Sequence, residues 1–144
     1  MSTEANKALV RRTLEEFYNQ GDLTLADEVF AANYVNHDPA QPEVRDLEGL
    51  KRYWMAICAG FPDHETTVEE LLADGQMVVK RAAFRGTQTG EFNGLPASGR
   101  RLAFSTISIY RIVDGKIAEC WWGYDSLGIM QQLGIMPAPE QVAV

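Results

Sequence analysis

Cysteine and histidine are scarce in this 144-residue chain, which contains two of each. Cys58 and Cys120 lie far apart and outside any Cys-x-x-Cys pair, so with the histidines they do not make up a typical zinc set. The chain also lacks a phosphate-cradling glycine loop and a flavin or nucleotide motif. We therefore expect no metal and no cofactor, and two buried, reduced thiols. Reduced thiols and an N-terminus without a secretory signal predict a cytoplasmic protein.

Positive charge and long apolar runs are also in short supply. Lysine and arginine total 13 against 20 aspartate and glutamate residues, a formal net charge of −7. This balance argues against nucleic acid or an anionic membrane surface as a partner. No apolar run approaches the roughly twenty residues needed to span a bilayer. A hydrophobic content of 46 % instead suits one globular domain over residues 1–144.

Apolar residues at helical spacing predict about three helices in the N-terminal part of the chain. The first covers about residues 3–20, and a short second helix starts at Thr24. The third follows Asp46, a good helix N-cap, and closes at Gly60.

After residue 61 the pattern changes to strands, and Asp74-Gly75 and Asp114-Gly115 are typical of hairpin turns. Four strands are predicted, over Glu65–Leu72, Met77–Arg85, Arg100–Val113 and Lys116–Tyr124. Helices followed by sequential hairpins predict an α+β domain, with the helices packed on one face of a curved, mainly antiparallel sheet.

Asp125 lies at the end of the last predicted strand, behind an aromatic segment. Side chains alternate with period two along a strand, so Asp125 shares the face of Trp121. If that face lines an apolar cavity, the carboxylate is placed for proton transfer. The competing interpretation is structural, because Asp125 and Ser126 both suit the N-cap of a short helix over about residues 127–133. Local spacing alone favours the cap.

Four segments resemble those of the SnoaL-like polyketide cyclase family. Gly115-Lys-Ile-Ala-Glu-Cys-Trp121 with Asp125, followed by Gln131-Gln-Leu-Gly134, resembles its C-terminal signature. Tyr34-Val-Asn-His-Asp-Pro39, Phe61-Pro-Asp63 and the hairpin from Gly86-Thr-Gln-Thr-Gly90 to Gly99-Arg100 follow in the expected order. The resemblance covers nearly the whole chain.

This resemblance implies the cone-shaped fold of nuclear transport factor 2 and ketosteroid isomerase, an α+β barrel around an apolar pocket with Asp125 inside. It implies an enzyme that acts on a hydrophobic, carbonyl-rich small molecule by aldol-type cyclisation or a related proton transfer, with Asp125 as the acid/base. Two alternatives stay open. One is another reaction on the same fold, by an epoxide hydrolase, an isomerase or a hydroxylation partner. The other is a ligand-binding or dimerisation module without chemistry.

The chain departs from the family where a partner for Asp125 is expected. Many members have Gly-Thr-His in the hairpin, where this chain has Gly86-Thr-Gln88. Family cyclases pair the aspartate with a histidine on the preceding strand, but Phe104–Arg111 contains none. The partner must then come from hydroxyls on that strand, such as Ser108, or from His37 or Arg81.

Several further residues are candidates for the site. We expect His37 to polarise a carbonyl or orient the substrate, although a lone histidine is more often structural. Outward salt bridging is the favoured role for Arg81, with an inward contact to Asp125 or to a substrate oxyanion as the alternative. The candidate wall residues, each with core packing as the competing role, are Tyr34, Trp54, Phe61 and Trp121.

The strand Arg100–Val113 carries apolar residues on both faces. Leu102, Phe104 and Tyr110 share one face, whereas Ile107 and Ile109 lie on the other. Helices cover one side of a sheet in this fold, so the second apolar face needs another cover. Together with the resemblance, this predicts a homodimer or homotetramer.

Overall fold

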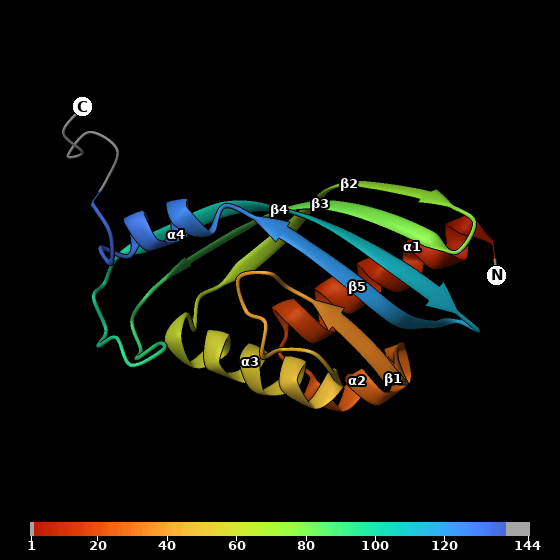
Figure 1. Cartoon of the computed structure of the whole chain (residues 1–144), viewed down its shortest axis with the longest axis horizontal. Coiled ribbons are helices and arrows are strands. Elements are labelled where there is room, and N and C mark those ends of the chain that lie inside the picture. Colours follow the sequence, from red (N-terminus) through yellow and green to blue (C-terminus); the bar gives the residue numbers. More distant parts are fainter. Residues whose placement is uncertain (1, 138–144) are drawn as a thin grey trace.

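One curved sheet of five strands, in the order β1-β5-β4-β3-β2, organises residues 2–137, the part of the chain that the computed structural model describes (Figure 1). The strands are β1 (Phe30–His37), β2 (Glu65–Asp74), β3 (Met77–Thr87), β4 (Arg101–Val113) and β5 (Lys116–Tyr124). Strands β2 to β5 pair antiparallel, and β1 adds to β5 in parallel. The four predicted strands and the mainly antiparallel sheet are confirmed, but β1 was not among the predicted strands.

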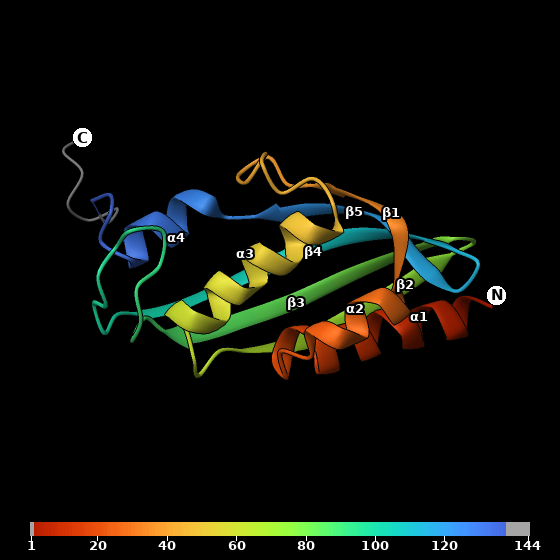
Figure 2. The same ribbon diagram turned by 90° about the horizontal axis from the view of Figure 1, so that it is seen from below.

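The sheet does not close into a barrel. β1 and β2 form its two edges and do not pair with each other, which corrects the barrel expected from the resemblance. The gap between the edges is filled by the N-terminal helices, so the cone is completed by helices rather than by strand pairing (Figure 2).

The three predicted N-terminal helices are present, with changes in detail. α1 (Thr3–Arg12) continues as a π-helical segment over Thr13–Asn19, and a 3-10 turn leads into the short α2 (Ala26–Val29). α3 (Leu47–Gly60) follows, and α4 (Ser126–Gln132) comes after β5. Within residues 2–137 no helix is long and apolar enough to cross a bilayer.

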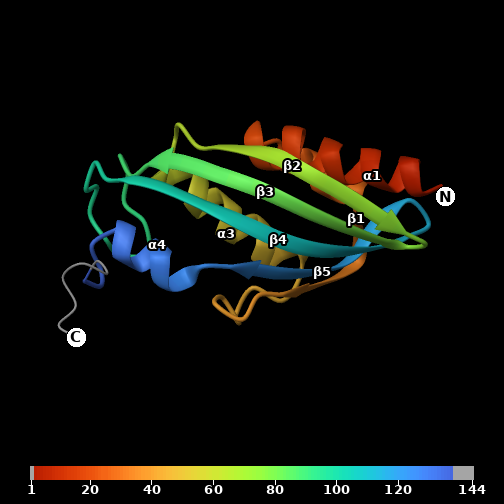
Figure 3. The same ribbon diagram turned by 90° about the horizontal axis from the view of Figure 1, so that it is seen from above.

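α1, α2 and α3 all lie on one face of the sheet. Figure 2 shows them in front of the strands, and the opposite view in Figure 3 shows the strands with α3 behind them. Figure 3 shows the other face of the sheet without these helices in front of it. α4 packs at the end of β4, where Ile129 and the C-cap residue Leu133 contact the inner-face cluster of Phe61 and Phe84. This layering is the predicted α+β arrangement.

Local sequence signals explain most element boundaries. The side chain of Asp46 accepts a hydrogen bond from the backbone N–H of Gly49 at 2.8 Å, so it caps α3 as predicted. At the β4–β5 hairpin, Asp114 and Gly115 have φ angles of 50° and 74°. Two successive positive φ angles match the twist of antiparallel strands, which is why an Asp-Gly pair occurs there.

β4 shows the alternation on which the inner and outer faces depend. Leu102, Thr106 and Tyr110 are buried, whereas Ile107 and Ile109 remain 55 % and 38 % exposed. The predicted division of this strand into two faces is confirmed. The inner face and the helices enclose the core, and the apolar outer face has no cover within residues 2–137.

The loop between β3 and β4 is fixed against the end of α3. Gln88 is buried in the loop, where its amide donates to the carbonyls of Leu95 and Pro96 and accepts from the hydroxyl of Ser98. The N–H of Gly90 donates to the carbonyl of Gly60 at 3.2 Å. The glutamine that stands where many family members have histidine thus has a structural role.

We predict that Gly90→Ala destabilises the protein. A Cβ at this position would collide with the carbonyl oxygen of Ala59, and overpacking of this kind costs about 1–3 kcal/mol. Urea unfolding measures the effect, with the exposed neighbour Thr89→Ala as the control. Equal stabilities of the two variants would show that the loop does not pack on α3 as described.

Candidate active site

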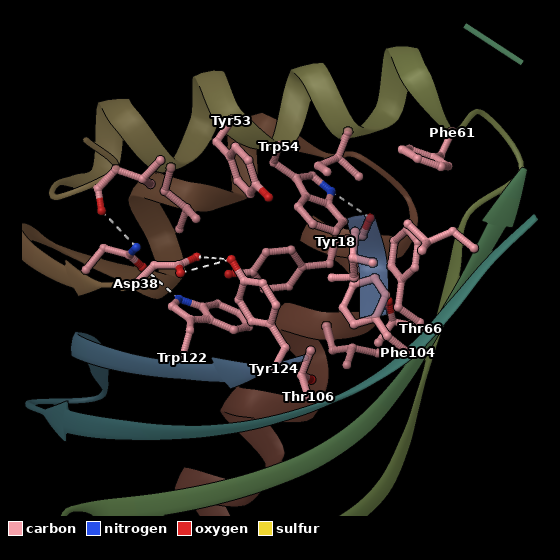
Figure 4. A pocket seen from close by; sticks show the side chains of 18 of the residues that line it. Tyr18, Asp38, Tyr53, Trp54, Phe61, Thr66, Phe104, Thr106, Trp122 and Tyr124 are labelled. Atoms are coloured by element: carbon pink, nitrogen blue, oxygen red, sulfur yellow. Dashed lines mark hydrogen bonds between the residues drawn. The ribbon is translucent and has the colours of Figure 1, made fainter. Parts of the chain in front are cut away.

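An apolar cavity lies between α3 and the inner face of the sheet (Figure 4). The centres of water-sized molecules can occupy about 100 Å³ of it, and about 870 Å³ is free of protein atoms when the open solvent at its mouth is included. Its walls are mostly aromatic and aliphatic: Leu14, Tyr18, Val44, Leu50, Tyr53, Trp54, Ile57, Phe61, Phe84, Phe92, Leu102, Phe104, Trp122, Tyr124 and Ile129. Its other wall residues are Asn36, Asp38, Thr66, Lys80 and Thr106.

Asp38 and Tyr124 form a hydrogen-bonded pair on the wall of this cavity. The Tyr124 hydroxyl lies 2.7 Å from Oδ2 and 2.9 Å from Oδ1 of Asp38, and it donates to the carboxylate (Figure 4). Burial, then Tyr53 and the Asp38 carboxylate, raise the pKa of Tyr124 well above its ordinary value. Burial and Asp38 likewise raise the pKa of Tyr53 to about 12. Both phenols are therefore neutral hydrogen-bond donors beside the carboxylate.

A buried hydrogen-bond network positions the segment that carries Asp38. Oδ1 of Asn36 accepts from the hydroxyl of Tyr34 at 2.7 Å and from the indole N–H of Trp122 at 2.8 Å. The Asn36 amide donates to the carbonyl of Val44 at 3.0 Å. Asn36 therefore ties β1 to β5 and to the chain before α3. Asp38 follows two residues later, and its Oδ1 also accepts from the N–H of Ala40.

Lys80 is the second charged group of the cavity wall, and it is 2 % exposed. Its ammonium lies 5.3 Å, 5.2 Å and 5.4 Å from the ring centroids of Tyr18, Tyr110 and Trp122. Three aromatic faces attract a cation through their quadrupoles. None of the ion pairs within residues 2–137 involves Lys80. Burial without a carboxylate lowers the pKa of Lys80 to about 8.

Asp125 does not lie in the cavity, which corrects its expected position. β5 ends at Tyr124, and the exposed Asp125 side chain turns back to accept from the N–H of Gly128 at 2.8 Å. The capping interpretation of Asp125 is therefore confirmed. Its catalytic role has no support from this geometry, and it stays a prediction that only turnover can test.

His37 also lies outside the cavity, on the outer side of β1. Its Nε2 is 2.6 Å from Glu119, and its ring stacks on Trp121 with a centroid distance of 5.2 Å. The contact with His37, together with Arg111, lowers the pKa of Glu119. The alternation along β1 explains this position, because Tyr34 and Asn36 are the inward residues and His37 has the opposite parity.

The expected wall residues divide into two groups. Trp54 and Phe61 line the cavity, and the indole of Trp54 donates to the carbonyl of Tyr18 at 2.9 Å. Tyr34 is buried in the core behind the wall, and Ser108 is fully buried on the inner face without lining the cavity.

Arg81 and Trp121 lie on the outer face, so the inward alternative for Arg81 is wrong, and Trp121 is not the wall residue that was expected. Arg81 pairs with Glu69 and Glu70 at 2.8 Å each, which confirms the outward salt bridging that the sequence favours. Trp121 faces away from the cavity because its neighbour Trp122 has the inward parity on β5.

Sequence reasoning missed three functional candidates, although each carried a signal. Asp38 continues the inward alternation of Tyr34 and Asn36 beyond the strand end. Lys80 has the parity of Val78 and Ala82, and a lysine on an apolar strand face is unusual. Tyr124 has the same parity as Trp122 on β5, and it directly precedes Asp125, the residue that the resemblance indicated.

No group of three or more histidine, cysteine, aspartate or glutamate side chains within residues 2–137 is placed to hold a metal ion. Cys58 and Cys120 are both free thiols in this part of the chain. Cys120 is fully buried, whereas Cys58 is only half-buried.

Comparison with known proteins gives a coherent set of matches. The family model described as SnoaL-like polyketide cyclase matches residues 8–133. Aklanonic acid methyl ester cyclase DnrD of Streptomyces peucetius is 34 % identical over 97 % of this chain and 97 % of its own length. The same-named enzyme DauD of Streptomyces sp. strain C5 is 34 % identical over 92 % of this chain and 84 % of its own.

Solved structures match in the same way. TsrD of Streptomyces laurentii superposes with a TM-score of 0.82 at 32 % identity, covering 94 % of this chain and 99 % of that chain. IdmH of Streptomyces antibioticus, a polyketide cyclase candidate, gives a TM-score of 0.78 at 31 % identity. The match covers 90 % of this chain and 98 % of that chain. These matches place the described cavity in a fold that other members share.

We predict that Lys80→Met stabilises the protein at pH 7 by on the order of 1–3 kcal/mol, because it removes a buried cation without a carboxylate partner. The pKa of Lys80 is about 8 in the folded chain, below the ordinary 10.5. Between these values the unfolded chain binds a proton that the folded chain does not, so wild-type stability rises with pH. The advantage of the variant should therefore shrink from pH 7 to pH 9.5 in urea unfolding. A variant that is less stable than wild type by the same amount at both pH values would show that the ammonium stabilises the fold.

Proposed function

The chain belongs to the SnoaL-like polyketide cyclase family, and on that premise we propose that it is a cofactor-independent enzyme that closes a ring in a hydrophobic, carbonyl-rich polyketide by acid/base catalysis. The curated relatives are named as cyclases of aklanonic acid methyl ester. The observation that carries the assignment of the site is that Asp38 is the carboxylate on the wall of the apolar cavity, held by the hydroxyl of Tyr124.

The proposed chemistry needs one base and no external electrons. A carbon between two carbonyls is already acidic, so a positioned carboxylate suffices to remove its proton. Asp38 takes this proton, and the resulting enolate carbon attacks a second carbonyl of the same molecule. One carbon–carbon bond forms, and the carbonyl π bond becomes an alkoxide. The alkoxide recovers the proton from Asp38, which restores the carboxylate.

The walls of the cavity favour this reaction in two ways. Trp54, Phe61 and Phe104 exclude water from the reacting chain, which strengthens the electrostatic interactions inside. The hydroxyls of Tyr53 and Tyr124 stay neutral. The hydroxyl of Tyr53, and that of Tyr124 once Asp38 has taken the proton, can donate to an oxygen that gains charge. A flexible chain with several carbonyls needs such a shaped apolar surface to bring its ends together.

The non-catalytic alternative predicts a cavity filled by tryptophan and tyrosine side chains. Trp54 and Trp122 instead both pack edge to face on the ring of Tyr18, and the cavity that these three residues line keeps free space beside them (Figure 4). This space favours an enzyme with a small-molecule ligand over a module used only for dimerisation. The free thiols of Cys58 and Cys120 support the expectation of a reducing, cytoplasmic compartment.

We predict that Asp38→Asn lowers turnover by about 10²–10⁴-fold, the range for loss of a general acid/base. The amide keeps an acceptor for the N–H of Ala40 and a partner for Tyr124, so the fold is preserved. Cyclisation of aklanonic acid methyl ester, the compound in the relatives' name, is the assay. Unfolding of each variant is measured in parallel.

Asp125→Asn is the matched control, because the amide can still cap α4. It should keep near wild-type turnover. Loss of turnover in Asp125→Asn with normal rates in Asp38→Asn would instead support the assignment made from the family signature. A wild-type protein that turns over neither this ester nor related polyketones would count against the cyclase itself.

We also propose that the exposed apolar face formed by Ile107 and Ile109 is covered by a second copy of the chain. Two-fold pairing of such faces is the simplest closed arrangement. Light scattering should give a mass of two or four times 16.1 kDa, and Ile107→Asp with Ile109→Asp should shift it toward one. Met55→Asp on the exposed side of α3 is the control. A wild-type mass near 16.1 kDa would contradict the assembly.

A further inference from the structure

The buried polar groups around Lys80 lack protein partners. The hydroxyls of Tyr18, Tyr110 and Ser108 are buried, and none has a hydrogen-bond partner within the described residues. Ser108 lies directly opposite Lys80 in the β3–β4 register, and the rings of Tyr18 and Tyr110 flank its ammonium. Buried polar groups in native proteins are nearly always satisfied, so a cluster of this kind requires an explanation.

Packing alone does not explain the cluster. Cation–π contacts of about 0.5–2 kcal/mol each offset part of the desolvation of a lysine, but they do not satisfy the hydroxyls. An apolar residue at position 80 would match Val78 and Ala82, its neighbours on the inner face. Lys80 and Tyr18 both line the cavity, so a molecule bound there lies against these two residues.

We propose that Lys80 and Tyr18 form an anion-binding subsite on the inner wall of the cavity, which receives an enolate or carboxylate oxygen of an aromatic or polycarbonyl substrate. Ser108 and Tyr110 support it from behind. The inference rests on the proposed function for its substrate class, and it adds a second polar pole to the cavity besides Asp38. A negative oxygen here gains a charge-assisted hydrogen bond in a poorly hydrated site, where such bonds are strong.

Asp38 and the subsite have different roles in the reaction. Asp38 removes the proton, and Lys80 stabilises the negative oxygen that this step creates. The ammonium keeps its proton throughout, so no covalent bond to the protein forms. A substrate that binds with its oxygen at Lys80 is also held in one orientation by the aromatic residues that line the cavity, among them Trp54 and Trp122.

Calorimetric binding of 2-naphthoate and of its neutral analogue 2-naphthamide tests the subsite without any turnover. Lys80→Met should weaken naphthoate binding at pH 7 by about 10- to 100-fold, and it should change naphthamide binding by less than about 3-fold. Lys7→Met is the control, because it removes the same charge from the surface of α1, where Lys7 pairs with Glu4.

The wild-type protein provides a second test that needs no variant. Naphthoate affinity should fall between pH 7 and pH 9.5 as Lys80, with a pKa of about 8, loses its proton, whereas naphthamide affinity should stay constant. The other titratable groups around Lys80 are Tyr18, Tyr34, Tyr110 and Cys120, and burial raises the pKa of each. Asp38 is the carboxylate on the same cavity wall.

Three results would overturn the subsite: no naphthoate binding to wild type, equal naphthoate affinity in wild type and Lys80→Met, or naphthoate affinity that is constant from pH 7 to pH 9.5. None of these results bears on the proposed role of Asp38 as the base, because that role is tested by the turnover of Asp38→Asn. Failure of this inference and failure of the proposed function are therefore distinguishable.

Discussion

The period-two alternation of side chains in one curved sheet determines which strand residues face the cavity of this protein. The inner face packs against α1, α2 and α3, and the outer face is largely open. On β5, Cys120, Trp122 and Tyr124 point inward, whereas Trp121 lies outside. α3 covers the inner face without filling it, so polar residues with inward parity such as Lys80 and Thr106 become wall residues of the cavity. A register slip of one residue would exchange the two sets.

The sequence predicts the architecture well because its signals are local. The cap at Asp46 and the turn at Asp114-Gly115 define elements without tertiary information. β1 is harder to find, because an edge strand that pairs in parallel with β5 depends on a partner far along the chain. The same limit applies to the closure of the sheet into a barrel. The resemblance to a family with a cone-shaped fold could not show that the edge strands β1 and β2 stay unpaired.

The site is predicted less well, and the errors have one physical cause. Alternation shows which residues share a face, but not which face is inside. Trp121 and Arg81 therefore stood as candidates, whereas their neighbours Trp122 and Lys80 line the cavity. The expected position of Asp125 in the cavity is wrong for another reason. Asp125 lies just beyond the end of β5, where the capping of α4, and not the pleat of the strand, sets the direction of its side chain. Lys80 is the residue that stability alone would exclude, and unsatisfied polar groups of this kind concentrate at functional sites.

Our central inference is that the cavity lined by Asp38 and Lys80 binds an anionic polycyclic ligand. A crystal structure of the protein with anthraquinone-2-carboxylate tests it most directly. We expect the rings of this ligand to lie between α3 and the inner face of the sheet, beside Trp54. Its carboxylate should lie at Lys80 and Tyr18. A ligand bound on the outer face near His37, or one whose carboxylate points away from Lys80, would contradict it.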